Sequence, residues 1–115
     1  MGVGSRFYSH VGDLQDRITR ALHDLDPALT VTEDLWERND AVGAPGGGGR
    51  TRAFQGDVIE NAGVNVSCVF GQVDPAFAER VGGEGDPVMW AAGISLIIHP
   101  RNPRVPTVHA NFRRI

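Results

Sequence analysis

The spacing of apolar residues changes once along this chain, and that change limits the folds open to it. Up to residue 25, apolar residues recur every three or four positions, which is typical of one face of an α-helix. These residues are Phe7, Val11, Leu14, Ile18, Leu22 and Leu25. After Leu29 the dominant pattern is alternation, which is typical of β-strands. We therefore predict a helix over residues 5–24, ended by Asp26-Pro27, and then a series of strands.

Five segments after the helix are predicted as strands: residues 51–54 and 58–61, a short hairpin split by Gln55-Gly56-Asp57, then 64–70, which alternates, 89–99, which is a long apolar run, and 105–113. Residues 29–38 are ambiguous, because threonines alternate with Leu29 and Val31 but Leu35-Trp36 breaks the period. Asp74-Pro75 predicts the start of a short helix that ends at Gly82. Together these elements predict an α+β fold, with a largely antiparallel sheet and a long N-terminal helix packed on one face.

Length and composition restrict the class of protein. A chain of 115 residues, 41% hydrophobic and 22% charged, predicts one globular domain over residues 1–115. A net charge of −3 with interspersed signs argues against a nucleic-acid partner. The longest apolar run, residues 90–98, is about half of the roughly 20 residues that span a bilayer. With no signal-peptide pattern and a single cysteine, we predict a cytoplasmic protein without a membrane span.

Four consecutive glycines, Gly46–Gly49, are the most unusual local feature. Such a run is costly in a helix or a central strand, so we predict a flexible loop beside a ligand pocket. A nucleotide-binding loop is disfavoured, because no lysine follows and Arg50-Thr51 opens a predicted strand. Cys68 alternates with apolar residues and is predicted to lie in the core.

The last two predicted strands carry the candidate chemistry. Because alternate strand residues share a face, Ser95 and His99 project together, and so do His109, Asn111 and Arg113. The short connection, residues 100–106, allows the two strands to pair as a wide hairpin, which would align all five side chains on one surface.

Several functions fit that surface. An arginine suits a carboxylate, an asparagine donates and accepts, and a histidine can move a proton near neutral pH. From the alternation alone, a face that simply meets solvent is the more economical interpretation. A metal site at His99 and His109 is disfavoured, because they are ten residues apart and no third ligand is evident.

Five stretches, in order, resemble the oxygen-dependent coproporphyrinogen-III oxidases. They are Asp-Leu-Trp-Glu-Arg at 34–38, Gly-Gly-Gly-Gly-Arg-Thr-Arg at 46–52, Glu-Asn-Ala-Gly-Val-Asn-Val-Ser at 60–67, Gly-Ile-Ser-Leu-Ile-Ile-His-Pro-Arg-Asn-Pro at 93–103 and Val-Pro-Thr-Val-His-Ala-Asn at 105–111. The last two are long and compositionally odd, which makes a chance match very improbable. The five stretches extend over most of the chain.

The resemblance implies an oxidoreductase of haem biosynthesis. Such an enzyme converts coproporphyrinogen III to protoporphyrinogen IX by oxidative decarboxylation of two propionates, with molecular oxygen as the oxidant. It implies a homodimer whose broad antiparallel sheet lies between helical layers. No organic cofactor or metal is required by most of the family, although a divalent metal is assigned in some bacterial members.

Carried over by position, the resemblance makes His109 the proton donor. It makes Ser95 a substrate contact and Asn111-Phe112-Arg113 a substrate-binding tripeptide. The metal assigned in some members would be held by His99 and His109.

This chain also departs from the family. Asn61 stands where a lysine is usual, and Arg114-Ile115 replaces an aromatic ending. The family continues through further strands that include a functional aspartate, and a domain seldom stops inside a sheet edge. We therefore predict the N-terminal portion of a single oxidase domain. The alternatives are a non-catalytic remnant that binds tetrapyrroles and a truncated gene product without a function.

Overall fold

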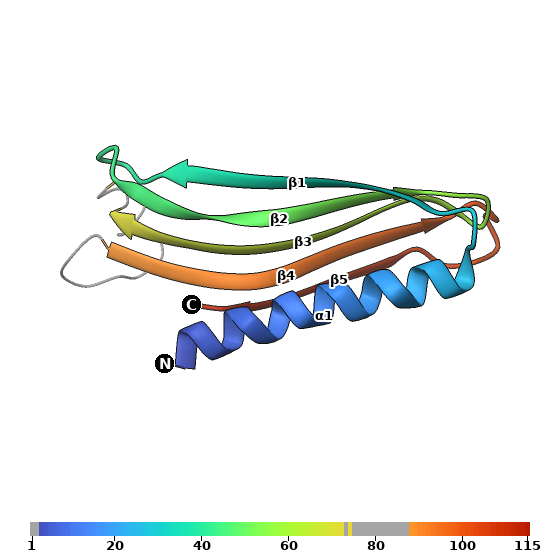
Figure 1. Cartoon of the computed structure of the whole chain (residues 1–115), viewed down its shortest axis with the longest axis horizontal. Coiled ribbons are helices and arrows are strands. Elements are labelled where there is room, and N and C mark those ends of the chain that lie inside the picture. Colours follow the sequence, from blue (N-terminus) through green and yellow to red (C-terminus); the bar gives the residue numbers. More distant parts are fainter. Residues whose placement is uncertain (1–2, 73, 75–87) are drawn as a thin grey trace.

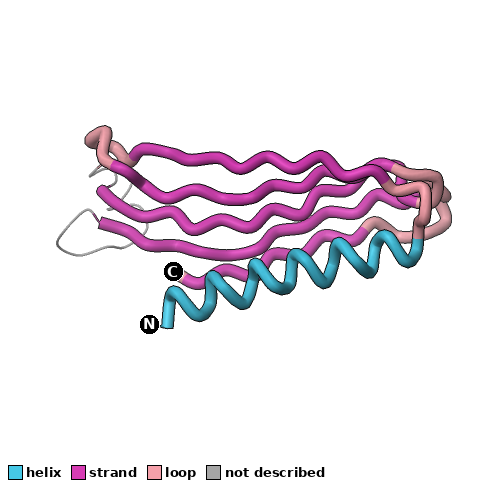
Figure 2. Tube along the Cα trace, in the orientation of Figure 1, coloured by secondary structure: helices cyan, strands magenta, loops and turns pink. Residues whose placement is uncertain are grey.

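The computed structural model describes residues 3–72, 74 and 88–115. The chain order is α1 (Val3–Leu25), β1 (Thr30–Asn39), β2 (Pro45–Gln55), β3 (Ile59–Gln72), β4 (Val88–Pro100) and β5 (Val108–Arg114) (Figure 1). Within the described residues these strands form one sheet, in the order β1-β2-β3-β4-β5, and every neighbouring pair is antiparallel. Figure 2 shows the long strands lying side by side, with the helix running along one face. The predicted α+β class is confirmed.

The N-terminal helix forms as predicted and buries its apolar stripe. Val11 and Leu22 are almost fully buried. The prediction that Leu25 belongs to this stripe is wrong, because its exposed fraction is 68%. Asp26 comes four residues after Leu22, so it occupies the next inward position, where it is buried.

The core lies between α1 and the middle strands. Its buried members from the sheet are apolar side chains that face the helix, chiefly Phe54, Ile59, Ala62, Val64, Val66 and Ile94. Alternation explains the set, since residues 62, 64 and 66 of β3 project to the same side.

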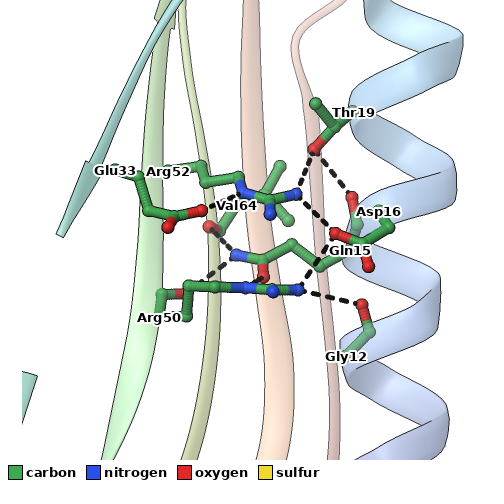
Figure 3. Close-up of polar contacts among 8 residues, drawn as sticks. All are labelled: Gly12, Gln15, Asp16, Thr19, Glu33, Arg50, Arg52 and Val64. Atoms are coloured by element: carbon green, nitrogen blue, oxygen red, sulfur yellow. Dashed lines mark hydrogen bonds and ion pairs between the residues drawn. The ribbon is translucent and has the colours of Figure 1, made fainter. Parts of the chain in front are cut away.

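A polar network joins the helix to β2 within this apolar layer (Figure 3). Gln15, which has no exposed surface, donates from Nε2 to the backbone carbonyls of Arg50 (2.8 Å) and Val64 (2.9 Å). Arg50 donates in turn to Oε1 of Gln15, and both Arg50 and Arg52 reach Asp16. The hydrogen bond from Arg52, with Arg50 close by, lowers the pKa of Asp16. Arg50 and Arg52 therefore fasten the helix to the sheet.

The prediction of a flexible glycine loop is wrong. Gly46–Gly49 belong to β2, which has β1 on one side and β3 on the other. A Cβ at Gly48 would meet the carbonyl oxygen of Trp36, and one at Gly49 would meet that of Val66. The glycines therefore allow neighbouring backbones to approach closely, which offsets their lower strand propensity.

Other boundaries differ from the sequence predictions. Residues 58–61 and 64–70 are one strand, β3, because its pairing with β4 continues through both segments. Residues 105–107 precede β5 and belong to the turn, where Val105 N–H donates to the carbonyl of Asn102. The ambiguous residues 29–38 are a strand, β1. The short helix predicted after Asp74 lies outside the described residues.

Cys68 is half-buried rather than a core residue, and burial raises the pKa of its thiol. No helix in the described part of the chain is both long and apolar enough to cross a membrane.

Candidate functional site

The helix covers one face of the sheet, and no other described element covers the opposite face (Figure 1). We call this second surface the open face. It is formed by every second residue of each strand, on the side of the sheet that carries the side chains of Thr51, Asn65, Ser95 and Asn111.

A row of polar residues crosses the open face at one level. The register pairs Asp34 with Thr51, Thr51 with Asn65, Asn65 with Ser95, and Ser95 with Asn111. Neighbouring members lie about one strand spacing, roughly 5 Å, apart. Five strands thus contribute one polar side chain each to a continuous line.

The adjacent positions add the charged and proton-carrying groups. On one side of the row, Arg113 lies opposite Gly93, where a Cβ would lie 2.5 Å from the carbonyl oxygen of Phe112, so the glycine allows the β5 backbone to approach closely. On the other side, His109 lies opposite Ile97. The predicted hairpin of the last two strands is confirmed, and it brings Ser95, His109, Asn111 and Arg113 to one face.

Two small hollows lie along this row and share Asn65 and Ser95. One, of about 210 Å³, includes Thr51, Ile97 and His109 in its lining. The other, of about 30 Å³, is lined by Asn65, Ser67, Gly93, Ile94, Ser95, Asn111 and Arg113. Four of the predicted site residues, Ser95, His109, Asn111 and Arg113, therefore line two neighbouring depressions.

Hydrogen bonds fix part of the row. Trp36 Nε1 donates to Thr51 Oγ1 (3.1 Å), and Thr51 Oγ1 donates to Asn65 Oδ1 (2.7 Å). An indole N–H can only donate, so the threonine hydroxyl accepts from Trp36 and uses its own hydrogen for Asn65. We call these two bonds the relay.

The other candidate residues are placed differently. Phe112 pairs with Ile94 and projects to the helix side of the sheet, where its exposed fraction is 59%. His99 lies on the open face opposite Asn61, one step beyond the position of His109. Among the described residues, no group of three or more histidine, cysteine or acidic side chains could hold a metal ion. The structure therefore gives no support to the metal assignment.

A larger hollow, of about 1050 Å³, lies elsewhere, along the glycine run. It is lined by Tyr8, Leu35, Trp36, Glu37, Arg38, Asn39, Pro45, Gly47, Gly48, Gly49, Cys68 and Phe70. None of the predicted site residues borders it. The smaller hollows are better candidates, because polar side chains from three strands converge there.

Trp36, Thr51 and Asn65 were not predicted as site residues. Asn65 could have been suspected from the alternation of residues 64–70, which leaves it on the polar side of its strand. Its alignment with Thr51 and Ser95 depends on the register of three strands, for which the sequence offers no local signal.

Comparison with known proteins adds independent information. Residues 6–115 match the profile of the family described as coproporphyrinogen III oxidase. The oxygen-dependent coproporphyrinogen-III oxidase of Coxiella burnetii strain RSA 493 is 47% identical over 106 residues, covering 90% of this chain and 33% of the relative. The enzymes of that name from strains Dugway 5J108-111 and RSA 331 are 47% and 48% identical, covering 33% and 31% of their lengths. This chain thus spans about a third of the length of these curated relatives.

Proposed function

The chain belongs to the coproporphyrinogen III oxidase family, and from this premise we propose that its open face forms part of the substrate site for the oxygen-dependent oxidation of coproporphyrinogen III. The relatives are named as enzymes for that reaction. The proposed product is protoporphyrinogen IX, as in haem biosynthesis. A cytoplasmic homodimer is part of the same proposal.

One observation carries the proposal for the site. Ser95, His109, Asn111 and Arg113 come from two strands, yet the register aligns them on the same uncovered side of the sheet. A large tetrapyrrole with propionate arms needs a broad surface with localised carboxylate partners, and this arrangement offers both.

The proposed roles follow from the chemistry of each side chain. Arg113 presents a planar set of donors that suits a propionate carboxylate. Ser95 and Asn111 lie beside it in the polar row and orient the ring by hydrogen bonds. His109, two positions from Asn111, moves a proton to or from the substrate.

The overall reaction balances without a redox cofactor. A propionate side chain loses carbon dioxide and becomes a vinyl group, which removes two electrons and two protons from the substrate. Molecular oxygen accepts them and becomes hydrogen peroxide. The electron-rich porphyrinogen can supply these electrons directly once a pyrrole N–H proton has been removed, so positioning and proton transfer are the tasks left to protein side chains.

Turnover of coproporphyrinogen III under air and without oxygen tests the proposal. The expected result is vinyl product that forms only with oxygen. Replacement His109→Ala should lower the rate by about 10²- to 10⁴-fold, the usual contribution of general acid–base catalysis. Unchanged turnover in that variant would refute the proton-transfer role.

A second candidate function is a tetrapyrrole-binding protein without catalysis. It is favoured by the lining of the two small hollows, which offers polar groups to the arms of a tetrapyrrole. Saturable binding of coproporphyrin without any oxygen-dependent product would support this function over the first.

A further inference from the structure

The smaller hollow combines hydrogen-bond donors from three strands. Its polar side chains are Asn65, Ser67, Ser95, Asn111 and Arg113, and none of its lining residues is acidic. A cation would find no compensating charge among these residues, whereas a carboxylate would find a guanidinium, two hydroxyl groups and amide N–H groups.

Asn65 differs from the other asparagine in this lining. Its carboxamide oxygen already accepts the hydroxyl hydrogen of Thr51 at 2.7 Å. Within the described residues, no hydrogen bond engages its Nδ2 group. Asn65 therefore offers two unused N–H donors, whereas its Oδ1 atom is already engaged once, so the side chain suits a carboxylate oxygen better than a pyrrole N–H.

The relay determines this property of Asn65. Thr51 Oγ1 accepts from Trp36 Nε1 and donates its hydroxyl hydrogen to Asn65 Oδ1, and this second bond holds the amide in the orientation that leaves Nδ2 free. Trp36 lies on β1 and Thr51 on β2, so two strands outside the β3–β5 lining hold the donor in place.

We propose that this hollow binds one carboxylate arm of the tetrapyrrole, with Asn65 as a direct ligand beside Arg113. Thr51 and Trp36 are positioning residues, which keep the N–H groups of the Asn65 amide directed at the carboxylate. The inference rests on the proposed function, because it takes the tetrapyrrole as the ligand of the open face.

Fluorescence titration of this chain with coproporphyrin III, and with its uncharged methyl ester, tests the direct contact. The Asn65→Asp variant keeps the shape of the side chain and the oxygen that accepts from Thr51. It replaces the Nδ2 donor by a second carboxylate oxygen, which faces the bound carboxylate. Affinity for the acid should fall at least about tenfold, the usual effect of losing one hydrogen bond to a charged group. Affinity for the ester should stay within about twofold of the unsubstituted chain, because the ester carries no anion to repel.

Asn61→Asp is the matched control, because it makes the same charge change on the same face of β3, about 13 Å along the strand and outside the hollow. Equal affinities for the acid in the Asn65→Asp and Asn61→Asp variants would overturn the inference while leaving the proposed function intact. Absence of coproporphyrin binding by the unsubstituted chain would overturn both.

The relay is tested separately. Thr51→Val removes the hydroxyl at nearly constant volume and should weaken binding of the acid, whereas Thr51→Ser retains the hydroxyl and should restore it. Full affinity in Thr51→Val would overturn the positioning role.

In the unsubstituted chain, the side-chain NH₂ signals of Asn65 in NMR spectra should move on titration with coproporphyrin. No movement at saturation would overturn the direct contact, without relying on any variant.

Discussion

Asp26 illustrates how one side chain can organise several strands. It is buried at the end of α1, and its Oδ2 atom accepts hydrogen bonds from the backbone N–H groups of Val58 (2.9 Å) and Ile59 (3.0 Å). These bonds, that of Ile59 first, lower the pKa of Asp26. The carboxylate thus satisfies donors at the turn between β2 and β3, and Gly56 leaves the space it needs.

Stability should therefore depend on the ionisation of Asp26. A carboxyl group whose pKa is lowered by folding stabilises the protein above its unfolded pKa, about 4, and this contribution is lost as the pH falls through the folded value. We expect the melting temperature to decline below about pH 4. Asp26→Asn should melt lower at neutral pH and show a weaker acid dependence, by thermal denaturation followed by circular dichroism.

Asp24→Asn serves as the control for this experiment, because Asp24 is exposed on the same helix. It should retain the acid dependence of the unsubstituted chain. An unchanged pH profile in Asp26→Asn would contradict the assignment. Asp40 retains some acid dependence in either variant, since its pKa is lowered by hydrogen bonds from Gln72, Ala44 and Val42 N–H.

Among the secondary-structure elements, β2 shows why composition alone misleads. Its glycines suggest a loop, yet they form a strand because their neighbours occupy the space where side chains would be. The same strand carries Arg50 and Arg52 on its helix side and Thr51 on its open face. One short sequence therefore serves close backbone packing, the attachment of the helix, and the relay.

Substitution of Gly49 by alanine should be strongly destabilising. The added Cβ would meet the carbonyl oxygen of Val66 and lie 2.6 Å from the Trp36 ring, so neighbouring strands would have to separate. We expect a loss of about 1–3 kcal/mol in the free energy of unfolding, the usual cost of overpacking. Gly12→Ala, in α1 with open space around the new Cβ, should instead gain up to about 1 kcal/mol. Equal effects in urea denaturation would contradict this account.

The contact between α1 and the sheet depends on Gln15. Gln15→Leu removes donors from two backbone carbonyls and an acceptor from Arg50, all in the helix–sheet layer. The expected loss is about 1–3 kcal/mol in the free energy of unfolding, because partners are left without hydrogen bonds. Gln55→Leu changes an exposed glutamine at the end of β2 and should stay within about 0.5 kcal/mol. A neutral Gln15→Leu would show that water replaces these bonds.

Across the whole molecule, the two faces of the sheet have different tasks. The side facing α1 supplies the apolar core, and the open face carries the polar row and its hollows. Adjacent residues of one strand therefore have different roles: in β4, Ile94 belongs to the core and Ser95 to the polar row.

This separation predicts opposite effects for those two neighbours. Replacement of Ile94, which is 1% exposed, by alanine should lower the free energy of unfolding by about 2–5 kcal/mol. Ser95→Ala should change stability by about 0.5 kcal/mol or less but weaken coproporphyrin binding. Denaturation and fluorescence titration of both variants check this. A Ser95→Ala chain that binds normally would remove Ser95 from the site.

The local pattern of the sequence was sufficient for the helix, the α+β class and the shared face of Ser95, His109, Asn111 and Arg113. Periodicity records which residues of one element point the same way, and β4 and β5 are joined by a short turn, so their mutual alignment is nearly a local property as well. The resemblance to the oxidases rests on the same contiguous stretches.

Other features cannot be predicted without the tertiary structure. Gln15 contacts Val64, 49 positions away, and Asp26 contacts Ile59, 33 positions away. Neither contact has a signature in the neighbouring residues. The relay likewise exists only because the register of β1, β2 and β3 places Trp36, Thr51 and Asn65 at one level. Periodicity specifies the face on which a side chain lies, whereas the partner it meets there depends on how distant segments align, and that alignment is set by the packing of the whole sheet against its helix.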